Sequence, residues 1–110
     1  MRPDEAIRAI DEQIALLTSI LQETEGAIAA LKELKERGEA IVPLGSGVLI
    51  PVKLSGEKIL VSVGGNVVVE KGIDDAIAVL EKRRENIKKS LEQTRQQRMK
   101  IVEQIRRVQR

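Results

Sequence analysis

The sequence predicts an α+β fold: an antiparallel two-helix coiled coil with two central β-hairpins, four short strands in all, that assemble into an intersubunit β-barrel. Two observations predict this fold. Apolar residues recur with heptad spacing towards both ends of the 110-residue chain. That spacing is lost in the middle, which holds six of the eight glycines and two of the three prolines. We therefore expect a single domain over residues 1–110, with helices over 1–38 and 73–110 and the hairpin region over 39–72.

The first helix is predicted by apolar or small side chains that step alternately by three and four residues. This spacing places them on one stripe of a helix that packs against a partner helix. Pro3 is tolerated in a first helical turn, and Gly38, which follows Lys35 and Arg37, is typical of a helix end. The stripe consists of Ile7, Ile10, Ile14, Leu17, Leu21, Thr24, Ile28 and Leu31.

The second helix repeats the pattern. Gly72, followed by Asp74 and Asp75, is typical of a helix start, because carboxylates in the first turn complement the helix dipole. Each helix has about 35 residues and spans roughly 50 Å at 1.5 Å per residue. The stripe of the second helix consists of Ile77, Leu80, Arg84, Ile87, Leu91, Thr94, Arg98, Ile101, Ile105 and Val108.

The charges of the two helices favour antiparallel pairing within one chain. Residues 1–40 carry a net charge of −4 and residues 71–110 a net charge of +6. Opposite charges on neighbouring heptad helices serve pairing, which we prefer to the alternative of a nucleic-acid-binding basic helix. The polar seam residues are predicted to fix the register of the pair. They are Thr24, Arg84, Thr94 and Arg98.

The hairpin region contains four short runs rich in β-branched residues. They cover residues 41–44, 48–54, 58–63 and 67–70, and the segments GSG, SGE and GGN separate them. Three-residue turns that contain glycine between such runs predict two consecutive hairpins. The glycines match no phosphate-binding motif. Pro51 indicates that its run is an edge strand or is bulged.

The hairpins are predicted to be the assembly surface. Apolar side chains occupy both faces, with Leu49, Leu60 and Val68 opposite the main set, and about thirty residues cannot bury two faces alone. Open strand edges also invite pairing with other chains. The predicted assembly residues are Val48, Ile50, Val52, Ile59, Val61, Val63, Val67 and Val69.

Composition narrows the possible functions. The chain has no Cys, His, Phe, Tyr or Trp. It therefore lacks the usual general base, thiolate and imidazole ligands, and aromatic stacking platforms. We expect no enzymatic activity, no cofactor, no metal site and no nucleic-acid partner. Short apolar runs and an N-terminus with acidic residues predict neither a membrane span nor a signal peptide, and hence a cytoplasmic location.

The segments VPLGSG and VSVGGNVVVEKGIDDAI, together with the order helix, two hairpins, helix, resemble the alpha-class subunit of archaeal prefoldin. Two hairpins indicate the alpha class, because beta-class subunits have one. The detailed resemblance covers about residues 40–85, and the arms match only as heptad helices. Both arms are shorter than is usual in that family, with no polar tail after Arg110. The shorter arms bear on the implied client binding at the helix tips more than on the implied assembly through the hairpins.

The resemblance implies a function and partners. Such subunits assemble with beta-class subunits into hexamers of two alpha and four beta chains around a double β-barrel. They hold unfolded proteins at the helix tips without ATP and pass them to a group II chaperonin. The alternative is a structural subunit that assembles through its hairpins into a scaffold or filament. The client-binding hypothesis rests on tip residues Ile7, Ile10, Met99, Ile101, Val102, Ile105 and Val108.

Overall fold

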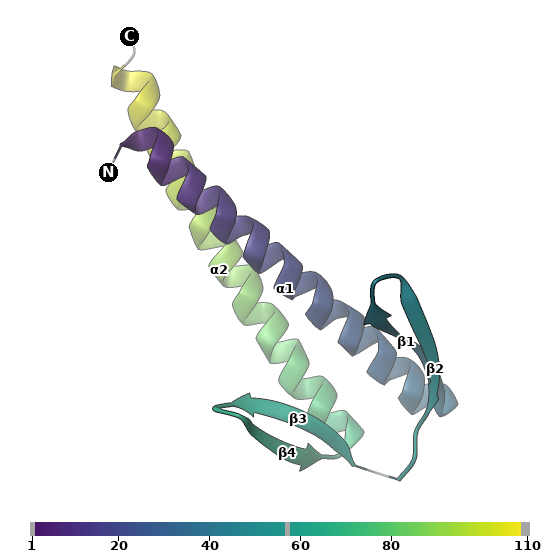
Figure 1. Ribbon diagram of the computed structural model, residues 1–110. Coiled ribbons are helices and arrows are strands. Elements are labelled where there is room, and N and C mark those ends of the chain that lie inside the picture. Colours follow the sequence, from purple (N-terminus) through teal and green to yellow (C-terminus); the bar gives the residue numbers. More distant parts are fainter. Residues whose placement is uncertain (1, 57, 109–110) are drawn as a thin grey trace. The chain divides into compact units, whose positions relative to one another are not determined.

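The computed structural model describes residues 2–56 and 58–108. Its elements follow the predicted order of helix, two hairpins and helix (Figure 1). They are α1 (Pro3–Arg37), β1 (Glu39–Gly45), β2 (Val48–Lys53), β3 (Ile59–Gly64), β4 (Val67–Lys71) and α2 (Ile73–Val108). The predicted α+β fold class is therefore confirmed, and the helix bounds lie within two residues of those expected.

The end of α1 and the start of α2 lie where the sequence predicts them. The Gly38 N–H donates to the Leu34 carbonyl at 2.8 Å, which closes the last turn of α1. The Gly72 carbonyl accepts from the Ala76 N–H at 2.9 Å, so Gly72 provides the first acceptor of α2. Acidic residues occupy the first turn of each helix and basic residues the last, which suits the helix dipole.

The strands form two separate antiparallel sheets, β1–β2 and β3–β4. Each loop has two residues, Ser46–Gly47 and Gly65–Asn66, rather than the three predicted. All four have positive φ, between 53° and 78°, which is the geometry of the tight hairpin turn that follows the twist of the strands. A bulge precedes each loop, between Pro43 and Gly45 and between Ser62 and Gly64.

The predicted SGE turn lies between the two hairpins, and its Glu57 falls outside the described residues. Within the described chain no strand pairs outside its own hairpin. The predicted barrel would thus be formed between subunits.

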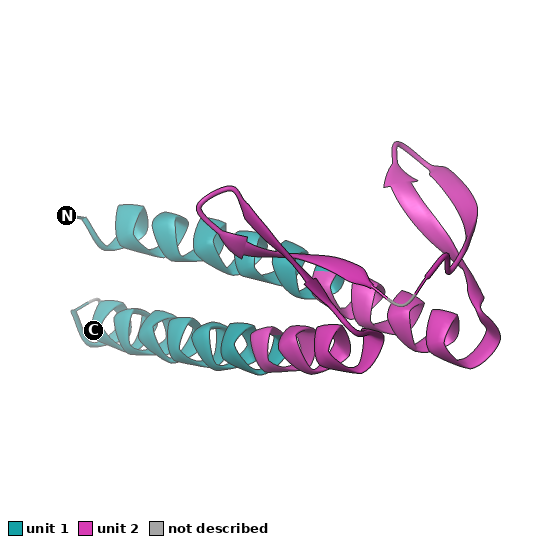
Figure 2. Ribbon diagram, turned by 90° about the horizontal axis from the view of Figure 1, so that it is seen from below, with its two compact units in different colours: residues 1–23, 84–110 teal, residues 24–83 magenta. Residues whose placement is uncertain are grey.

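The contacts divide the chain into two compact units (Figure 2). The arm unit comprises residues 1–23 and 84–110. Its two helical segments run antiparallel (Figure 2), and the Arg98 Nε donates to the Asp11 carboxylate at 2.7 Å between them. This hydrogen bond, together with the attraction of the two charges, raises the pKa of Arg98 above its usual value, so Arg98 stays charged. Thr94 is buried, and its hydroxyl donates to the Ser90 carbonyl.

The hairpin unit comprises residues 24–83 and contains most of the buried apolar side chains. The Lys35 ammonium pairs with the Asp74 carboxylate at 2.6 Å and links the end of α1 to the start of α2. Here too the helical segments run antiparallel (Figure 2). The core of this unit consists of Ile28, Ala40, Val61, Ala76 and Ile77.

By length and composition alone, α1 could cross a membrane, because an 18-residue stretch of it has a mean hydropathy of 1.3. The short apolar runs in the sequence did not predict this. The seam residues of α1 are buried or half-buried against the rest of the chain. This pattern fits one helix of a soluble coiled coil.

Candidate assembly surface and arm tips

Each hairpin turns one face towards the helices of the hairpin unit. Side chains alternate along a strand, so the register defines the two faces. In the first hairpin Ala40 is buried and its neighbours Val42 and Val52 are half-buried. In the second, Val61 is 7% exposed. An apolar recess of about 330 Å³ lies beside this inner face, where Ile59 and Val61 approach Leu31 and Leu80 of the two helices.

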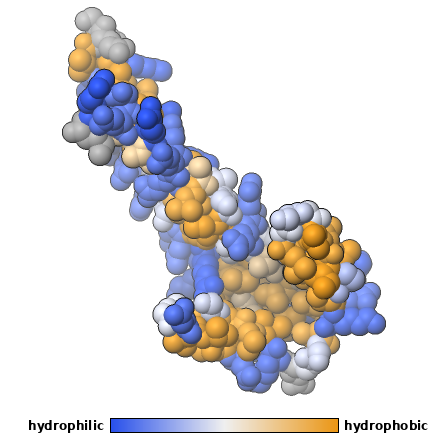
Figure 3. Space-filling model, in the orientation of Figure 1, coloured by the Kyte–Doolittle hydropathy of each residue, from blue (hydrophilic) through white to orange (hydrophobic). Residues whose placement is uncertain are grey.

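The outer faces remain exposed. Ile41 and Leu49 of the first hairpin are 61% and 63% exposed, and Leu60 and Val68 of the second are 70% and 56% exposed. Figure 3 shows apolar surface gathered over both hairpins. Exposed apolar patches of this kind mark interaction sites, since a water-soluble chain seldom leaves them uncovered.

The predicted assembly residues differ in how far they are exposed. Val48, Ile50, Val63 and Val67 are exposed, whereas Val52, Ile59 and Val69 are half-buried and Val61 is buried within its own chain. Their role stays a prediction. The sequence did not single out Ile41 and Leu44, although both are exposed; their presence in an apolar run was the available signal.

A hydrogen bond connects the second hairpin to α2. The Arg83 guanidinium donates to the Ser62 carbonyl of β3. Arg83 itself is half-buried, so its aliphatic part packs while its charged end reaches the strand.

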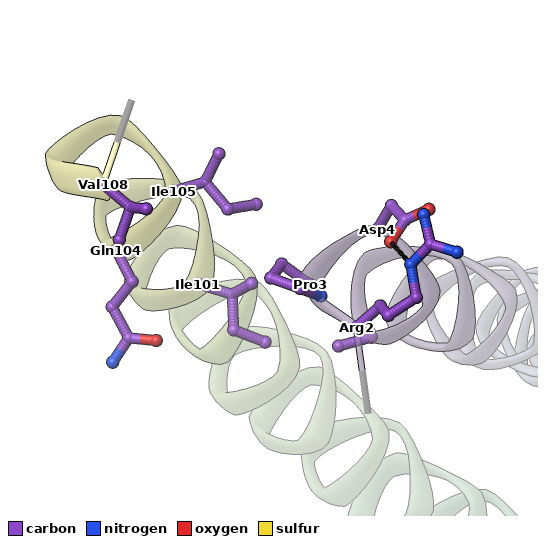
Figure 4. A pocket seen from close by; sticks show the side chains of 8 residues that line it. Arg2, Pro3, Asp4, Ile101, Gln104, Ile105 and Val108 are labelled. Carbon is purple, nitrogen blue, oxygen red and sulfur yellow. Dashed lines mark ion pairs between the residues drawn. The ribbon is translucent and has the colours of Figure 1, made fainter. Parts of the chain in front are cut away.

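The ends of the two helices in the arm unit line an open recess of about 610 Å³ (Figure 4). Pro3 and Ala6 line it from α1, and Ile101, Ile105 and Val108 from α2. Arg2 and Asp4 form an ion pair at 3.5 Å on its rim. The recess is apolar with a polar rim, which suits an apolar side chain from another protein.

Three of the seven predicted client-binding residues thus share this recess: Ile101, Ile105 and Val108. Val108 is 84% exposed. Met99 is 64% exposed but does not line the recess. Ile7, Ile10 and Val102 are half-buried elsewhere in the arm unit. The sequence prediction missed Pro3 and Ala6, which carry no periodic signal.

The described residues contain no group of three or more acidic, His or Cys side chains that could hold a metal ion. The surface features that stand out are strand edges and apolar faces at the hairpins, and an apolar recess at the helix ends. They define a helical subunit that assembles through β-hairpins.

Comparison with known proteins agrees with this class. The family model described as "Prefoldin subunit" matches residues 3–110. Prefoldin subunit alpha of Thermofilum pendens is 33% identical over 103 residues, which cover 90% of this chain and 80% of the relative. Prefoldin subunit alpha of Methanococcoides burtonii is 35% identical over 88 residues, which cover 76% of this chain and 64% of the relative. This chain belongs to the prefoldin family, whose members are chaperones that form hetero-oligomers.

A solved structure supports the fold. The cryo-EM structure of filamentous prefoldin from Methanocaldococcus jannaschii superposes with a TM-score of 0.75 and covers 96% of this chain and 91% of that one. Its sequence identity is 23%, so the likeness concerns the fold alone. The suspected resemblance to archaeal prefoldin of the alpha class is confirmed by the sequence relatives.

Proposed function

We propose that this chain is a subunit of an ATP-independent chaperone that binds unfolded proteins at the ends of its helices and delivers them to a group II chaperonin. The observation that carries the proposal is the apolar recess at the helix ends, in a chain of the prefoldin family. The exposed Met99 in the last part of α2 is flexible and polarizable, which suits contact with many different sequences.

The proposed partners are beta-class prefoldin subunits, in a hexamer of two alpha and four beta chains. Exposed apolar side chains on the hairpins support assembly at that end. The proposed location is the cytoplasm. We propose no cofactor, no nucleic-acid partner and no membrane partner. The proposed activity is binding of unfolded proteins without catalysis. Several arms acting together would raise the effective concentration of weak apolar contacts around one client.

The test uses the assembled protein and a chemically denatured substrate. Changing Met99 and Val102 to Ser removes apolar surface near the helix ends without altering a seam position. We expect several-fold weaker suppression of aggregation, with the mass of the assembly unchanged. Leu16→Ser is the matched control, because Leu16 is also exposed on the arm unit, at 61%, but lies near the middle of α1 and not at the helix ends. Equal suppression by all three proteins would contradict binding at the tips.

A second candidate is a structural subunit that assembles through its hairpins into a scaffold or filament. The observation that favours it is the fold similarity to a filamentous prefoldin. Light scattering of the purified chain, alone and with a beta-class subunit, separates the candidates. The chaperone proposal expects a defined hexamer with the partner, and the scaffold expects open-ended growth of this chain alone.

A further inference from the structure

The apolar stripe of α2 continues into the recess at the helix ends, the tip recess, while its burial decreases along the arm unit. Leu91 is 3% exposed and Thr94 is 4% exposed, whereas Ile101 and Ile105 are half-buried and Val108 is 84% exposed. Ile101, Ile105 and Val108 are spaced by four residues and then by three, which is the seam spacing of the rest of the helix. The tip recess therefore presents the part of the coiled-coil stripe that the arm unit covers least.

Small side chains on α1 account for this loss of burial. The hydrogen bond from Arg98 to Asp11 sets the level of one helix against the other. Seven residues beyond Arg98 lies Ile105, and the same count back from Asp11 reaches the first turn of α1. Here α1 lines the recess with Pro3 and Ala6, which are smaller than the isoleucines and leucines of its seam. The volume of about 610 Å³ is the space that larger seam residues fill elsewhere.

The exposed stripe suits a helix better than an extended segment. A helix with apolar residues spaced by three and four positions can place them between Ile101, Ile105 and Val108, as in helix-in-groove recognition. The peptide groups of such a helix bond to one another. Figure 4 shows Ile101 and Pro3 on facing sides of the recess. An extended segment between them would bury unpaired N–H and C=O groups against apolar side chains, which is costly.

The charges near the tip recess favour an acidic occupant. Residues 98–108 of α2 include four basic residues and one acidic residue, whereas residues 2–8 of α1 include two of each. Arg106 and Arg107, which follow Ile105 in the sequence, are exposed. On the rim, Arg2 already pairs with Asp4. A helix with Glu or Asp beside its apolar stripe would therefore meet opposite charge on α2.

We propose that the tip recess binds segments of unfolded proteins as amphipathic helices with acidic flanks, which extend the coiled-coil seam along Ile101, Ile105 and Val108. This proposal rests on the proposed function, because it specifies the conformation and the charge of what the helix ends bind. A segment that can form such a helix binds more tightly than a segment of the same composition that cannot.

Dye-labelled peptides test this preference with the full chain. The probe is a short peptide of Ala, Leu and Glu whose leucines are spaced by three and four residues. The control has the same composition with its leucines spaced by two, so that they share a strand face and no helix face. We expect fluorescence anisotropy to show about tenfold tighter binding of the probe, because burial of one further leucine is worth at least that factor. Equal or tighter binding of the control would overturn the proposal.

A third peptide tests the charge preference. It has Lys in place of every Glu of the probe and keeps the leucine spacing. We expect it to bind several-fold more weakly at low salt, and the difference to shrink at high salt, because ions screen exposed charges. Equal binding of the two peptides at low salt would contradict the acidic flanks.

Variants of the chain test whether the probe binds at the tip recess. Val108→Ser removes an exposed stripe residue, and Ala6→Leu fills the recess from α1. We expect both to weaken binding of the probe several-fold, and Leu16→Ser, near the middle of α1, to leave it unchanged. Ala6→Leu should also raise the urea midpoint, so that its weaker binding is not a loss of folding. Unchanged binding in both recess variants would overturn the proposal.

The outcomes separate this proposal from the proposed function. Equal binding of probe and control, lost alike in Val108→Ser, would contradict the helical preference and leave binding at the helix ends in place. Failure of the chain to bind either peptide, together with unchanged aggregation of a denatured protein in its presence, would contradict both.

Discussion

The two hairpins share one backbone plan and differ in the side chains placed on it. In both, a bulge precedes a two-residue loop. The last residue of the first strand in each hairpin is a glycine with a positive φ, 108° for Gly45 and 99° for Gly64. At corresponding positions of the two registers, however, the first hairpin has Pro43 and Pro51 where the second has Ser62 and Glu70. The two hairpins therefore share their bulge and loop geometry, but at these positions only the second keeps backbone N–H groups that can donate.

The inner faces differ as well. In the first hairpin the buried residue is the small Ala40, whereas in the second it is Val61, which corresponds to the half-buried Val42 of the first hairpin. Burial of a valine side chain contributes about 1.5–3 kcal/mol, so the second hairpin is the more firmly packed against its own chain.

The largest expected effect comes from charging that inner face. Val61→Asp would bury an unpaired carboxylate against the helices and should lower the free energy of unfolding by several kcal/mol. The corresponding Val42→Asp should cost less, because Val42 is only half-buried. Urea denaturation followed by circular dichroism measures both.

Leu60→Asp is the control on the outer face of the same strand. Leu60 is 70% exposed, so the variant should unfold at nearly the wild-type urea concentration under conditions where the chain is monomeric. If Leu60→Asp destabilised the monomer as much as Val61→Asp, the assignment of inner and outer faces would be wrong.

Alanine at the bulge glycines tests whether the two backbone plans are the same. Gly45 and Gly64 have φ values that side chains rarely adopt, so each change to Ala should cost about 1–3 kcal/mol. The two costs should agree to within about 0.5 kcal/mol, since no atom would contact either added Cβ. A large loss at one site and none at the other would show that the hairpins are not equivalent.

Loss of the Arg83 contact should have a smaller effect, confined to the second hairpin. Arg83→Met keeps the aliphatic packing and removes the donor to the Ser62 carbonyl, at a cost of about 1 kcal/mol. Amide exchange of β3 should accelerate while that of β1 stays unchanged. Equal acceleration in both hairpins would instead indicate a general loss of stability.

The smallest effect concerns a glycine that no turn requires. Gly26 lies within α1, and a Cβ there would contact nothing within 4 Å. Gly26→Ala should therefore stabilise the chain by about 0.5–1 kcal/mol, opposite in sign to the hairpin glycines. A decrease in the urea midpoint would show that this position has a structural role.

The periodic parts of the molecule were predictable, because heptad spacing, Gly38 and the paired aspartates at 74 and 75 each correspond to one local structure. The bulges and two-residue loops were not. Ser46 adopts a positive φ that its side chain does not favour, so the sequence GSG suggested a longer turn.

The sequence also could not show which face of each hairpin packs against the helices. Leu49 and Ile50 are both apolar, as are Leu60 and Val61, so alternation alone could not show which residue of each pair faces the helices. The tip recess depends on Pro3 and Ala6, which belong to no repeat. Packing between distant segments decides both features.

Amide hydrogen exchange of the assembled protein tests the central claim most directly, because it reports the outward peptide groups of the two hairpins in one sample. We predict that the outward N–H groups of both hairpins, those of Val68 and Glu70 on β4 and those of Leu49 and Lys53 on β2, become strongly protected on assembly, because a closed barrel leaves no strand edge open. Fast exchange of these N–H groups in the assembled protein would contradict assembly through the hairpins.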